Sequence, residues 1–517
     1  MQVVDNKVLV VKTPTPDAIL TAITKSKVIS KSDGEYEVAV HWGMDEARAL
    51  TLLGSKAPSP ILRDYKWTGK FTPFAHQKET AAFLTLNDKA FCFSQAGTGK
   101  TASVIWAADY LMKLGKVKRV LVVCPLSIMK SAWQQDLFKF AMHRSVGVAY
   151  GDANTRSKVI KAGAEFVIIN FDGIAVVRDE IIKGGFDLIV ADEATFLKTQ
   201  TTTRWKVFNE IAKHATRLWL LTGTPAAQSP LDAYGLAKLV NPAGIPRYYG
   251  NFRDQVMYKV TQYKWVPRPN AEAIVHLALQ PAIRFEKKDC LDLPEVTHVE
   301  RDAPLTPQQR AYYNTLSRQL RFSTDEADVT AVNAAAKIIK LLQISCGAVR
   351  TDTGEALEFD VSNRLKVVEE VINETGNKVL IFVPFTYTID LLKKYLDHKG
   401  ISNECIDGRV SLNTRSQIVS DFQTKPDPKV LILQPQAASH GLTLTAADTV
   451  VWYAPVTSVE TYLQANARID RPGQRNAMTV VHIQGSPVEE RLYAMLRGNI
   501  LNHNKIVELY RELVAQA

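Results

Sequence analysis

Short apolar runs, each followed by a longer amphipathic stretch, recur along the chain from Phe74 onward. The first five runs span residues 91–94, 119–124, 165–170, 187–191 and 218–222. Runs of this length suit strands buried on both faces, and strands joined by helices are typical of a parallel sheet covered by helices. A second series, KVLIFV, KVLILQ, DTVVWYA and MTVVHIQ, begins at Lys378 and includes the helical stretch TIDLLKKYL. The pattern therefore predicts an α/β fold with two parallel-sheet lobes of similar size.

The segments outside these two series carry other patterns. Near the N-terminus, the strand KVLVV and the helix TPDAILTAI precede two strands around an Asp33-Gly34 turn and the helix MDEARALTLL. Between about Ala233 and Glu369 the pattern is mostly helical, with Pro-rich breaks at WVPRPN and DLPEV. We therefore predict a small N-terminal α/β module (1–70), a first lobe (71–240), a helical insertion and joint region (241–360), a second lobe (361–485) and C-terminal helices (486–517).

The composition agrees with a soluble globular protein. The chain has 517 residues, of which 46 % are hydrophobic and 22 % charged, and this length suits two or three domains. No stretch reaches about 18 consecutive apolar residues, and MQVVDNKVLV lacks the order of a secretory signal, so we expect neither a membrane span nor export. The five cysteines are scattered and never form C-x-x-C, which predicts no zinc site and a reducing, intracellular compartment. The formal charge of +10 suits a polyanionic partner but does not identify one.

The strongest chemical signal is SQAGTGKT, between the run at 91–94 and the helical stretch TASVIWAADYLMK. Small and glycine residues let backbone N–H groups surround a phosphate at a helix N-terminus, where the helix dipole favours negative charge. In such a loop Lys100 would reach the β- and γ-phosphates, and the Thr101 hydroxyl would bind Mg²⁺. The strict pattern has Gly where this chain has Ser94. The residues assigned to the phosphate loop are Ser94, Gln95, Ala96, Gly97, Thr98, Gly99, Lys100 and Thr101.

A second signal follows the run FDLIVA, which ends in Asp192 and Glu193. An acidic pair at the carboxyl end of a buried strand can supply a Mg²⁺ ligand, here Asp192, and a base for the attacking water, here Glu193. Alone, such a pair is more often a solvated strand end. The phosphate loop upstream makes it the second half of one nucleotide site.

A third signal is QANARIDRPGQ, in which Arg468 and Arg471 are three residues apart. On a helix this spacing puts both guanidinium groups on one face, where they could stabilise charge on a transferred γ-phosphoryl group. The alternative is an exposed basic turn that ends at Pro472-Gly473. We predict Lys100, Asp192, Glu193, Arg468 and Arg471 as the catalytic residues.

The order and spacing of these blocks, from about Phe74 to Gln484, resemble a helicase-like ATPase of superfamily two, and within it the Swi/Snf family of DNA translocases. The blocks that carry the resemblance also include VVCPLSIMKSAWQQDLFKF, INFDGI, DEATFLK, LLTGTPAAQSPLDAYGLAKLVNP, FEKKDCLDLPEV and GLTLTAADTVVWY. The resemblance implies two RecA-like lobes, ATP and Mg²⁺ as cofactors, and DNA as the partner. A chain of this size resembles compact bacterial or bacteriophage forms, which implies the cytoplasm of a bacterial or phage-infected cell.

The resemblance also implies roles for single residues. Gln77 in FAHQKE would recognise adenine, and Gln464 would also belong to the nucleotide site. Thr222, Gly223 and Thr224 would couple hydrolysis to motion, and Pro125, Asn170, Gly441 and Thr445 would face the nucleic-acid backbone, although each could equally be part of a strand-end turn. The chain departs from the family at Thr195, where His is usual, at Ser94 and Gln95, where an acidic pair is common, and at Gln436 and His440, where Arg and Leu are usual.

Three functions follow as hypotheses. The first is a translocase on double-stranded DNA that remodels DNA or protein–DNA complexes. The second is a strand-unwinding or annealing helicase that acts at forks or recombination intermediates, on single-stranded or forked DNA. The third is a scaffold whose lobes close on a partner when ATP binds. In the N-terminal module, Trp42, Lys56, Arg63, Lys66 and Trp67 could form either a nucleic-acid clamp or part of a docked cap.

Overall fold

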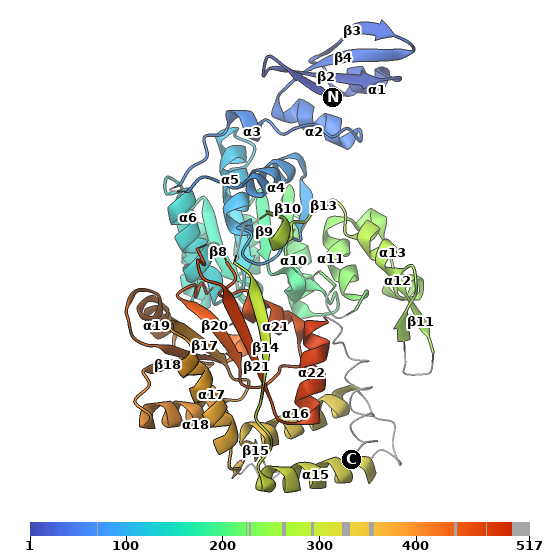
Figure 1. Cartoon of the computed structure of the whole chain (residues 1–517). Coiled ribbons are helices and arrows are strands. Elements are labelled where there is room, and N and C mark those ends of the chain that lie inside the picture. The colour runs from blue at the N-terminus through green and yellow to red at the C-terminus, as the bar shows by residue number, and fades with distance from the viewer. Residues whose placement is uncertain are drawn as a thin grey trace. The chain divides into compact units, whose positions relative to one another are not determined.

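The computed structural model describes residues 1–69, 71–223, 225–226, 229–260, 265–290, 294–322, 331–350, 356–438, 442–471 and 473–498. The chain divides into two compact units, one of residues 1–226 and 230–290 and the other of residues 227–229 and 291–517 (Figure 1). Three of the sequence predictions, those for Thr224, Gly441 and the C-terminal segment after residue 498, lie outside the described residues.

The N-terminal module contains every element that its sequence predicts. Strands β2 (Val8–Thr13), β3 (Ser26–Ser32) and β4 (Glu35–His41) form an antiparallel sheet, which β1 (Gln2–Val4) extends to the order β1-β2-β4-β3. Helices α1 (Asp17–Ala22) and α2 (Met44–Leu52) complete it. At the β3–β4 turn, Asp33 and Gly34 both have positive φ, which suits a tight hairpin that follows the strand twist.

Aromatic packing joins this module to the first lobe through α3 (Ile61–Asp64) and the residues after it. The Trp42 side chain is 5 % exposed, donates Nε1–H to the Pro58 carbonyl at 2.8 Å and lies under the Arg63 guanidinium. Trp67 meets Trp106 of the first lobe edge-on, with 5.5 Å between the ring centroids. Three of the five residues proposed for a clamp, Trp42, Arg63 and Trp67, are therefore used within the unit, which favours the docked cap.

The first lobe is built on a sheet of seven parallel strands. Their order is β13 (Ala282–Ile283), β5 (Lys89–Cys92), β10 (Arg217–Leu221), β9 (Leu188–Asp192), β6 (Val120–Cys124), β8 (Phe166–Asn170) and β7 (Val146–Ala149). The five strands expected from the apolar runs are all present. Strands β7 and β13 were not predicted, because Gly147 interrupts the apolar residues of β7 and β13 has only two residues.

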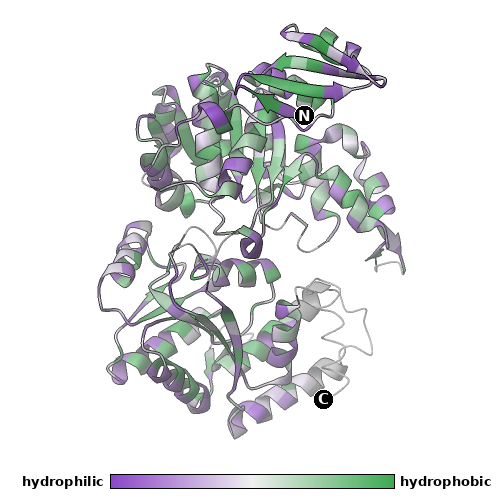
Figure 2. Cartoon of the chain, turned by 45° about the horizontal axis from the view of Figure 1, so that its top comes forward, coloured by the Kyte–Doolittle hydropathy of each residue, from purple (hydrophilic) through white to green (hydrophobic). Residues whose placement is uncertain are grey.

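Helices cover both faces of this sheet. On one face lie α4 (Ala75–Leu86), α5 (Lys100–Lys113) and α6 (Gln135–Phe140). On the other face lie α7 (Ala153–Lys161), α9 (Arg178–Lys183), α10 (Thr203–Ala212) and α11 (Asp232–Val240). Alternate strand residues point to the two faces: Leu121 and Val123 join one core, whereas Val120 and Val122 join the other. In Figure 2 the hydrophobic colour follows these strands, as burial on both faces requires.

The second unit holds a parallel sheet of six strands. Their order is β14 (Val296–Asp302), β21 (Met478–Gln484), β20 (Ala447–Trp452), β17 (Lys378–Phe382), β19 (Val430–Leu433) and β18 (Asn403–Ile406). The accompanying helices include α15 (Pro307–Phe322), α16 (Ala331–Cys346), α17 (Ser362–Glu374), α18 (Thr386–His398), α19 (Leu412–Thr424), α21 (Val459–Asn466) and α22 (Pro487–Arg497). The two α/β lobes of the sequence prediction are thus confirmed.

The joint region differs from the expected helical insertion in one respect. It is rich in helices, as predicted, but β13 pairs with β5 of the first sheet and β14 pairs along its whole length with β21 of the second. It also forms the antiparallel hairpin of β11 (Met257–Lys259) and β12 (Trp265–Pro267). The sequence VTHVERD of β14 lacks an apolar run because it lies at a sheet edge, where half of its side chains are exposed.

The part of the chain that the structure describes contains neither a membrane-spanning helix nor a cluster of metal-ligating side chains. None of its helices is long and apolar enough to cross a membrane. No group of three or more His, Cys, Asp or Glu residues there is placed to hold a metal ion, and all five cysteines are free thiols.

Candidate functional site

The predicted phosphate loop connects the end of β5 to the start of α5, and residues 94–101 all lie there. Gly97 and Gly99 have φ of 91° and 81°, a left-handed conformation that glycine adopts at little cost. Gly99 is the residue that caps α5, so the first unpaired N–H groups of a 14-residue helix face the loop. This is the geometry of an anion site, and it fits the phosphates of a nucleotide.

Gln77 of α4 contacts this loop directly. Its Nε2 donates to the Thr98 carbonyl at 3.2 Å, and its Oε1 accepts from the Phe74 N–H at 3.0 Å. A Cβ atom on Gly99 would stand only 2.1 Å from Gln77 Nε2. Gly99 therefore suits the left-handed backbone here, and any larger residue would force the Gln77 side chain to move. The structure brings Gln77 to the loop, beside the position predicted for the nucleotide.

Lys100 and Asp192 are near enough for their charges to interact. The Lys100 ammonium donates to the carbonyls of Ser94 at 2.5 Å and of Gln95 at 3.1 Å, which uses two of its three donors. Asp192 ends β9, and its carboxylate accepts from Trp133 Nε1 at 2.9 Å. Burial raises the pKa of the Asp192 carboxyl above its ordinary value, and the Lys100 charge opposes that rise. A half-buried carboxylate beside a phosphate loop fits a Mg²⁺ ligand, because this ion takes oxygen donors.

Glu193 stands next to Asp192 in an unusual backbone conformation, with φ 60° and ψ 55°. Left-handed non-glycine residues are uncommon and cluster at functional sites. The Glu193 carboxylate accepts from the hydroxyls of Thr222 at 3.3 Å and Thr195 at 3.4 Å. Thr195, which departs from the family pattern, is thus a partner of the predicted base. Sequence reasoning found the departure but not this contact.

Thr222 and Gly223 follow β10, the strand between β5 and β9. A Cβ atom on Gly223 would lie 3.8 Å from the backbone of Gln95 and Ala96, so this residue runs beside the phosphate loop. Of the predicted coupling residues that the structure describes, Thr222 therefore contacts Glu193 and Gly223 lies beside the loop. The reason is topological, since neighbouring parallel strands end at the same edge of a sheet.

Ser94 and Gln95 bind the segment after β13. The Phe285 N–H donates to Ser94 Oγ at 3.1 Å, and the Lys287 N–H donates to Gln95 Oε1 at 3.0 Å. In return the Gln95 N–H donates to the Phe285 carbonyl at 3.0 Å. The joint segment thus closes one side of the loop, a contact between residues about 190 positions apart that no local pattern could reveal.

The residues predicted to face nucleic acid in this lobe have different environments. Pro125 follows β6 directly. Asn170 ends β8, is 8 % exposed, and its Oδ1 accepts from Arg156 Nη1 at 2.8 Å. Arg156, which the sequence did not single out, also donates to the carbonyls of Ala149 and Gly151. The Asn170 side chain is therefore held within the lobe, and its predicted role remains a prediction.

The two arginines of the second unit do not lie on a helix, contrary to the expectation. Helix α21 ends at Asn466, and Arg468 and Arg471 occupy the turns that follow, because the chain bends ahead of Pro472-Gly473. They nevertheless bind the same loop: Arg468 donates to the Leu442 carbonyl at 3.3 Å, and Arg471 to Thr443 Oγ1 at 3.1 Å. Arg468 is buried, at 3 % exposed, whereas Arg471 is half-buried.

The remaining predicted residues of the second unit lie near this loop or on α21. Thr445 follows the bound loop, and its hydroxyl accepts from Gln423 Nε2 at 3.4 Å. Gln464 lies on α21; its carbonyl accepts from Arg468 Nε at 2.8 Å, and its side chain donates to Glu460 at 3.3 Å. The second unit thus brings Gln464, Arg468 and Arg471 together.

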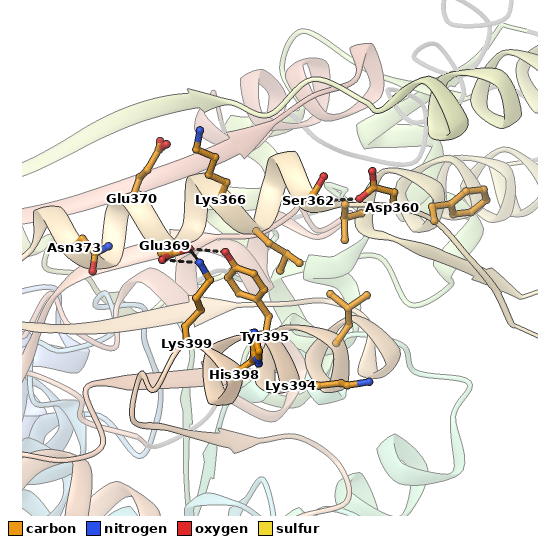
Figure 3. A pocket seen from close by; sticks show the side chains of 14 residues that line it. Asp360, Ser362, Lys366, Glu369, Glu370, Asn373, Lys394, Tyr395, His398 and Lys399 are labelled. Atoms are coloured by element: carbon orange, nitrogen blue, oxygen red, sulfur yellow. Dashed lines mark hydrogen bonds and ion pairs between the residues drawn. The ribbon is translucent and has the colours of Figure 1, made fainter.

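A groove of about 900 Å³ lies elsewhere in the second unit, between α17 and α18 (Figure 3). Its wall includes Glu369, which pairs with Lys399 at 2.9 Å and accepts from the Tyr395 hydroxyl. None of the site residues predicted from the sequence lines it. The groove therefore belongs to none of the sites predicted from the sequence.

Two family models match most of the chain. The family model described as SNF2-related domain matches residues 76–350, and that described as helicase conserved C-terminal domain matches residues 363–473. A mouse chromodomain-helicase-DNA-binding protein 1-like is 27 % identical over 444 residues, which are 80 % of this chain and 47 % of the mouse protein. Putative protein p41 of a phage from an aphid endosymbiont is 27 % identical over 429 residues, which are 79 % of this chain and 90 % of p41.

Several relatives are much longer than the matched region. The chain spans less than half the length of the mouse relative, and 40 % of an uncharacterized ATP-dependent helicase from Mycoplasma genitalium that is 26 % identical over 434 residues. Among solved structures, the SWI2/SNF2 ATPase core of Sulfolobus solfataricus in complex with double-stranded DNA matches with a TM-score of 0.41 and 23 % identity, over 84 % of this chain and 92 % of that chain.

Proposed function

Because the chain belongs to the SNF2-related family of helicase-like ATPases, we propose that it couples ATP hydrolysis to movement along double-stranded DNA. The observation that carries the proposal is the meeting of three elements at one sheet edge. Thr222 donates to the Glu193 carboxylate, Gly223 runs beside the phosphate loop, and the Lys100 charge acts on the Asp192 carboxyl there. ATP binding, ATP hydrolysis and the conformational change that drives movement would thus depend on the same group of neighbouring residues.

Each of these neighbouring groups has a defined task. The N-terminal N–H groups of α5 and the Lys100 ammonium bind the phosphates and neutralise the charge that moves during transfer. Thr101 and Asp192 would hold Mg²⁺, which would supply positive charge to stabilise the transferred phosphoryl group. Glu193 orients the attacking water and accepts its proton on the carboxylate. Gln77 hydrogen-bonds the nucleotide from its position against the loop.

The coupling step uses the Glu193–Thr222 contact. A proton on the Glu193 carboxylate removes the negative charge that the Thr222 and Thr195 hydroxyls bind, so these hydrogen bonds weaken. The change reaches Gly223, which runs beside the phosphate loop. This chain of contacts gives hydrolysis a direct route to the end of β10.

The second unit supplies positive charge. Arg468 is buried and holds the loop before β20, so we assign it to positioning. Arg471 is the more exposed of the two and is assigned to the charge that develops on the γ-phosphoryl group.

Two features support DNA as the track. The chain carries a net charge of +10, which favours a polyanion. One relative is named a chromodomain-helicase-DNA-binding protein 1-like. The free cysteines and the phage and Mycoplasma relatives support a reducing bacterial or phage-infected cytoplasm as the place of action.

The first test is ATP hydrolysis by the purified chain without nucleic acid and with single-stranded, double-stranded or forked DNA, or RNA. We expect duplex DNA to stimulate best, and Glu193→Gln to reduce the stimulated kcat by at least about 100-fold, since it removes the base. Glu210→Gln, on the surface of α10, is the matched control and should hydrolyse normally. Displacement of a triplex-forming strand then measures movement along the duplex.

Other outcomes point to the other hypotheses. Stimulation mainly by forks or single strands, together with strand separation, would indicate an unwinding or annealing helicase. Binding of ATP without hydrolysis under any nucleic acid would indicate the ATP-gated scaffold. Normal turnover in Glu193→Gln would remove the role assigned to that carboxylate.

A further inference from the structure

Exposed aromatic and basic side chains lie in the first unit, away from the nucleotide loop in sequence. They are found where α12 (Tyr249–Val256) leads into the hairpin of β11 and β12. We propose that Arg247, Tyr248, Tyr258 and Lys259, here called the aromatic-basic surface, bind an unpaired nucleic-acid strand.

The tyrosines of this surface are exposed on a firmly packed support. Tyr248 is 64 % exposed and Tyr258 is 42 % exposed, although large aromatic side chains usually bury most of their area. Successive residues of a strand point to opposite faces, and Met257, the neighbour of Tyr258, is buried in the core. Tyr258 therefore points away from the lobe. A rotation of the strand that buried Tyr258 would expose Met257 to solvent.

Other residues of the hairpin hold this support in place. Trp265 of β12 packs against the core, with the Arg253 guanidinium 4.1 Å from its ring centroid. Arg268 Nε donates to the carbonyls of Asp254 at 2.9 Å and Met257 at 3.1 Å, which fastens the base of the hairpin to α12. Arg253 and Arg268 are thus engaged by the hairpin and α12, and the exposed cations Arg247 and Lys259 flank the two tyrosines in sequence.

The charge of this region suits a polyanion. Residues 247–268 contain five Lys or Arg residues and one carboxylate, Asp254. Asp254 is paired with Arg253 at 2.9 Å, so it does little to offset the outward cations. The Arg247 guanidinium lies over the Tyr248 ring, 5.6 Å from its centroid, which places a cation directly beside an exposed aromatic face.

Aromatic rings and cations together favour an unpaired strand over a duplex. Every base has a flat face that can stack on tyrosine, but a duplex covers these faces with neighbouring bases. Cations alone would bind the phosphates of either form. Tyr248 and Tyr258 stand at the two ends of the eight-residue helix α12, roughly 12 Å apart along its axis, so one short stretch of strand could reach both.

This inference goes beyond movement along a duplex. A motor that tracks paired DNA needs no site for open bases. A chain with such a site can also hold a single-stranded tail or a displaced strand, so tailed duplexes would be bound better than blunt ones.

The test measures fluorescence anisotropy of labelled DNA with the full chain, without nucleotide, so that it does not depend on ATP hydrolysis. The probes are a blunt duplex, the same duplex with a single-stranded tail, and the tail strand alone. We expect Tyr248→Ala with Tyr258→Ala to weaken binding of the tailed duplex and the single strand at least about tenfold, and to leave the blunt duplex unchanged. Tyr248→Phe with Tyr258→Phe should retain binding, because stacking needs the ring and not the hydroxyl.

Phe138→Ala is the matched control, since it removes an aromatic ring that is 69 % exposed on α6 of the same lobe. Arg247→Gln with Lys259→Gln should make the salt dependence of single-strand binding less steep by about 1.4 in log–log slope, for two lost phosphate contacts. Thermal unfolding of each variant checks that the fold is kept.

Three results would overturn the proposal. One is equal affinity of the alanine variant and the unsubstituted chain for tailed DNA, as expected if the surface binds an acidic protein instead. Another is equal loss on blunt and tailed DNA, which would indicate phosphate contacts alone. The third is loss of binding in the phenylalanine variant. Failure of duplex-stimulated hydrolysis would refute the proposed motor but not this surface, because binding is measured without ATP.

Discussion

At the scale of single residues, the nucleotide site depends on glycines for two different reasons. Gly99 and Gly115 flank α5, and both have left-handed backbones, with φ of 81° and 68°. The two glycines differ in the room around them. A Cβ on Gly99 would meet Gln77 Nε2 at 2.1 Å, whereas a Cβ on Gly115 would meet nothing within 4 Å. Alanine substitutions at these two glycines therefore separate the effect of backbone strain from the effect of a steric clash with Gln77.

Gly99→Ala is expected to raise the KM for ATP, because the new methyl group displaces Gln77 from the loop. Gly115→Ala should leave KM unchanged. Both substitutions should destabilise the chain by about 1–2 kcal/mol, since each forces alanine into the left-handed region. Steady-state ATP hydrolysis and thermal unfolding measure the two effects. An equal rise of KM in both variants would show that strain alone, and not the position of Gln77, affects binding.

At the scale of elements, Asp109 fastens α5 to its surroundings. Its side chain is fully buried and accepts from the Tyr65 hydroxyl at 2.6 Å and from Arg144 Nε at 2.7 Å. Lys113 at 3.0 Å and His143 at 2.8 Å complete the cluster. Burial alone would raise the pKa of the Asp109 carboxyl, but these hydrogen bonds outweigh it and lower the pKa to about 2. The helix α5, which begins at the phosphate loop, is thus anchored in its C-terminal half.

This depressed pKa predicts how stability varies with pH. The carboxylate stabilises the fold above its unfolded pKa of about 4, and the contribution is lost as the pH falls toward 2, the folded value. The stability advantage of the unsubstituted chain over Asp109→Asn should therefore shrink by about 1 kcal/mol between pH 7 and pH 3. Urea unfolding followed by tryptophan fluorescence measures it.

Asp179→Asn serves as the control for Asp109→Asn, because the Asp179 side chain is 65 % exposed and little of the fold depends on it. Its effect should be small at both pH values. A stability difference for Asp109→Asn that stays constant with pH would mean that this carboxyl titrates alike in the folded and unfolded chain.

At the scale of the whole molecule, the N-terminal module and the first lobe belong to one unit. Trp67 lies between Tyr65 and Trp106, meeting each ring edge-on, and the Trp106 indole donates to the Thr68 carbonyl at 2.9 Å. These contacts continue the core of the lobe into the segment that carries the module. The exposed lysines of this region, Lys56 and Lys66, take no part in them.

If the module is a docked cap, substitutions at the packed Trp67 and at the exposed lysines Lys56 and Lys66 should have different effects. Trp67→Ala should lower stability by roughly 2 kcal/mol, because it removes a half-buried indole, and should leave the salt dependence of duplex binding unchanged. Lys56→Gln with Lys66→Gln should change neither property. If the module were a clamp on DNA, the lysine variant would instead make the salt dependence less steep by about 1.8 in log–log slope. Thermal unfolding and a salt titration of DNA affinity distinguish the two.

The sequence by itself determined the two lobes, the phosphate loop and the acidic pair, because these depend on local patterns. A buried parallel strand needs an unbroken apolar run, as at Val120–Cys124, and a phosphate loop needs glycines at fixed places before a helix. Family resemblance added the places of Gln77 and Thr222, but not their contacts.

Tertiary structure alone decided what joins these local pieces. Edge strand β14 was missed because none of its residues is fully buried, so its sequence carries no apolar run. The arginine pair left the expected helix because the chain bends before Pro472. The contacts of Ser94 with Phe285 and of Glu193 with Thr222 join residues far apart in the chain, so no local pattern encodes them. The same is true of the aromatic-basic surface, since exposure of Tyr248 and Tyr258 depends on what the rest of the lobe covers.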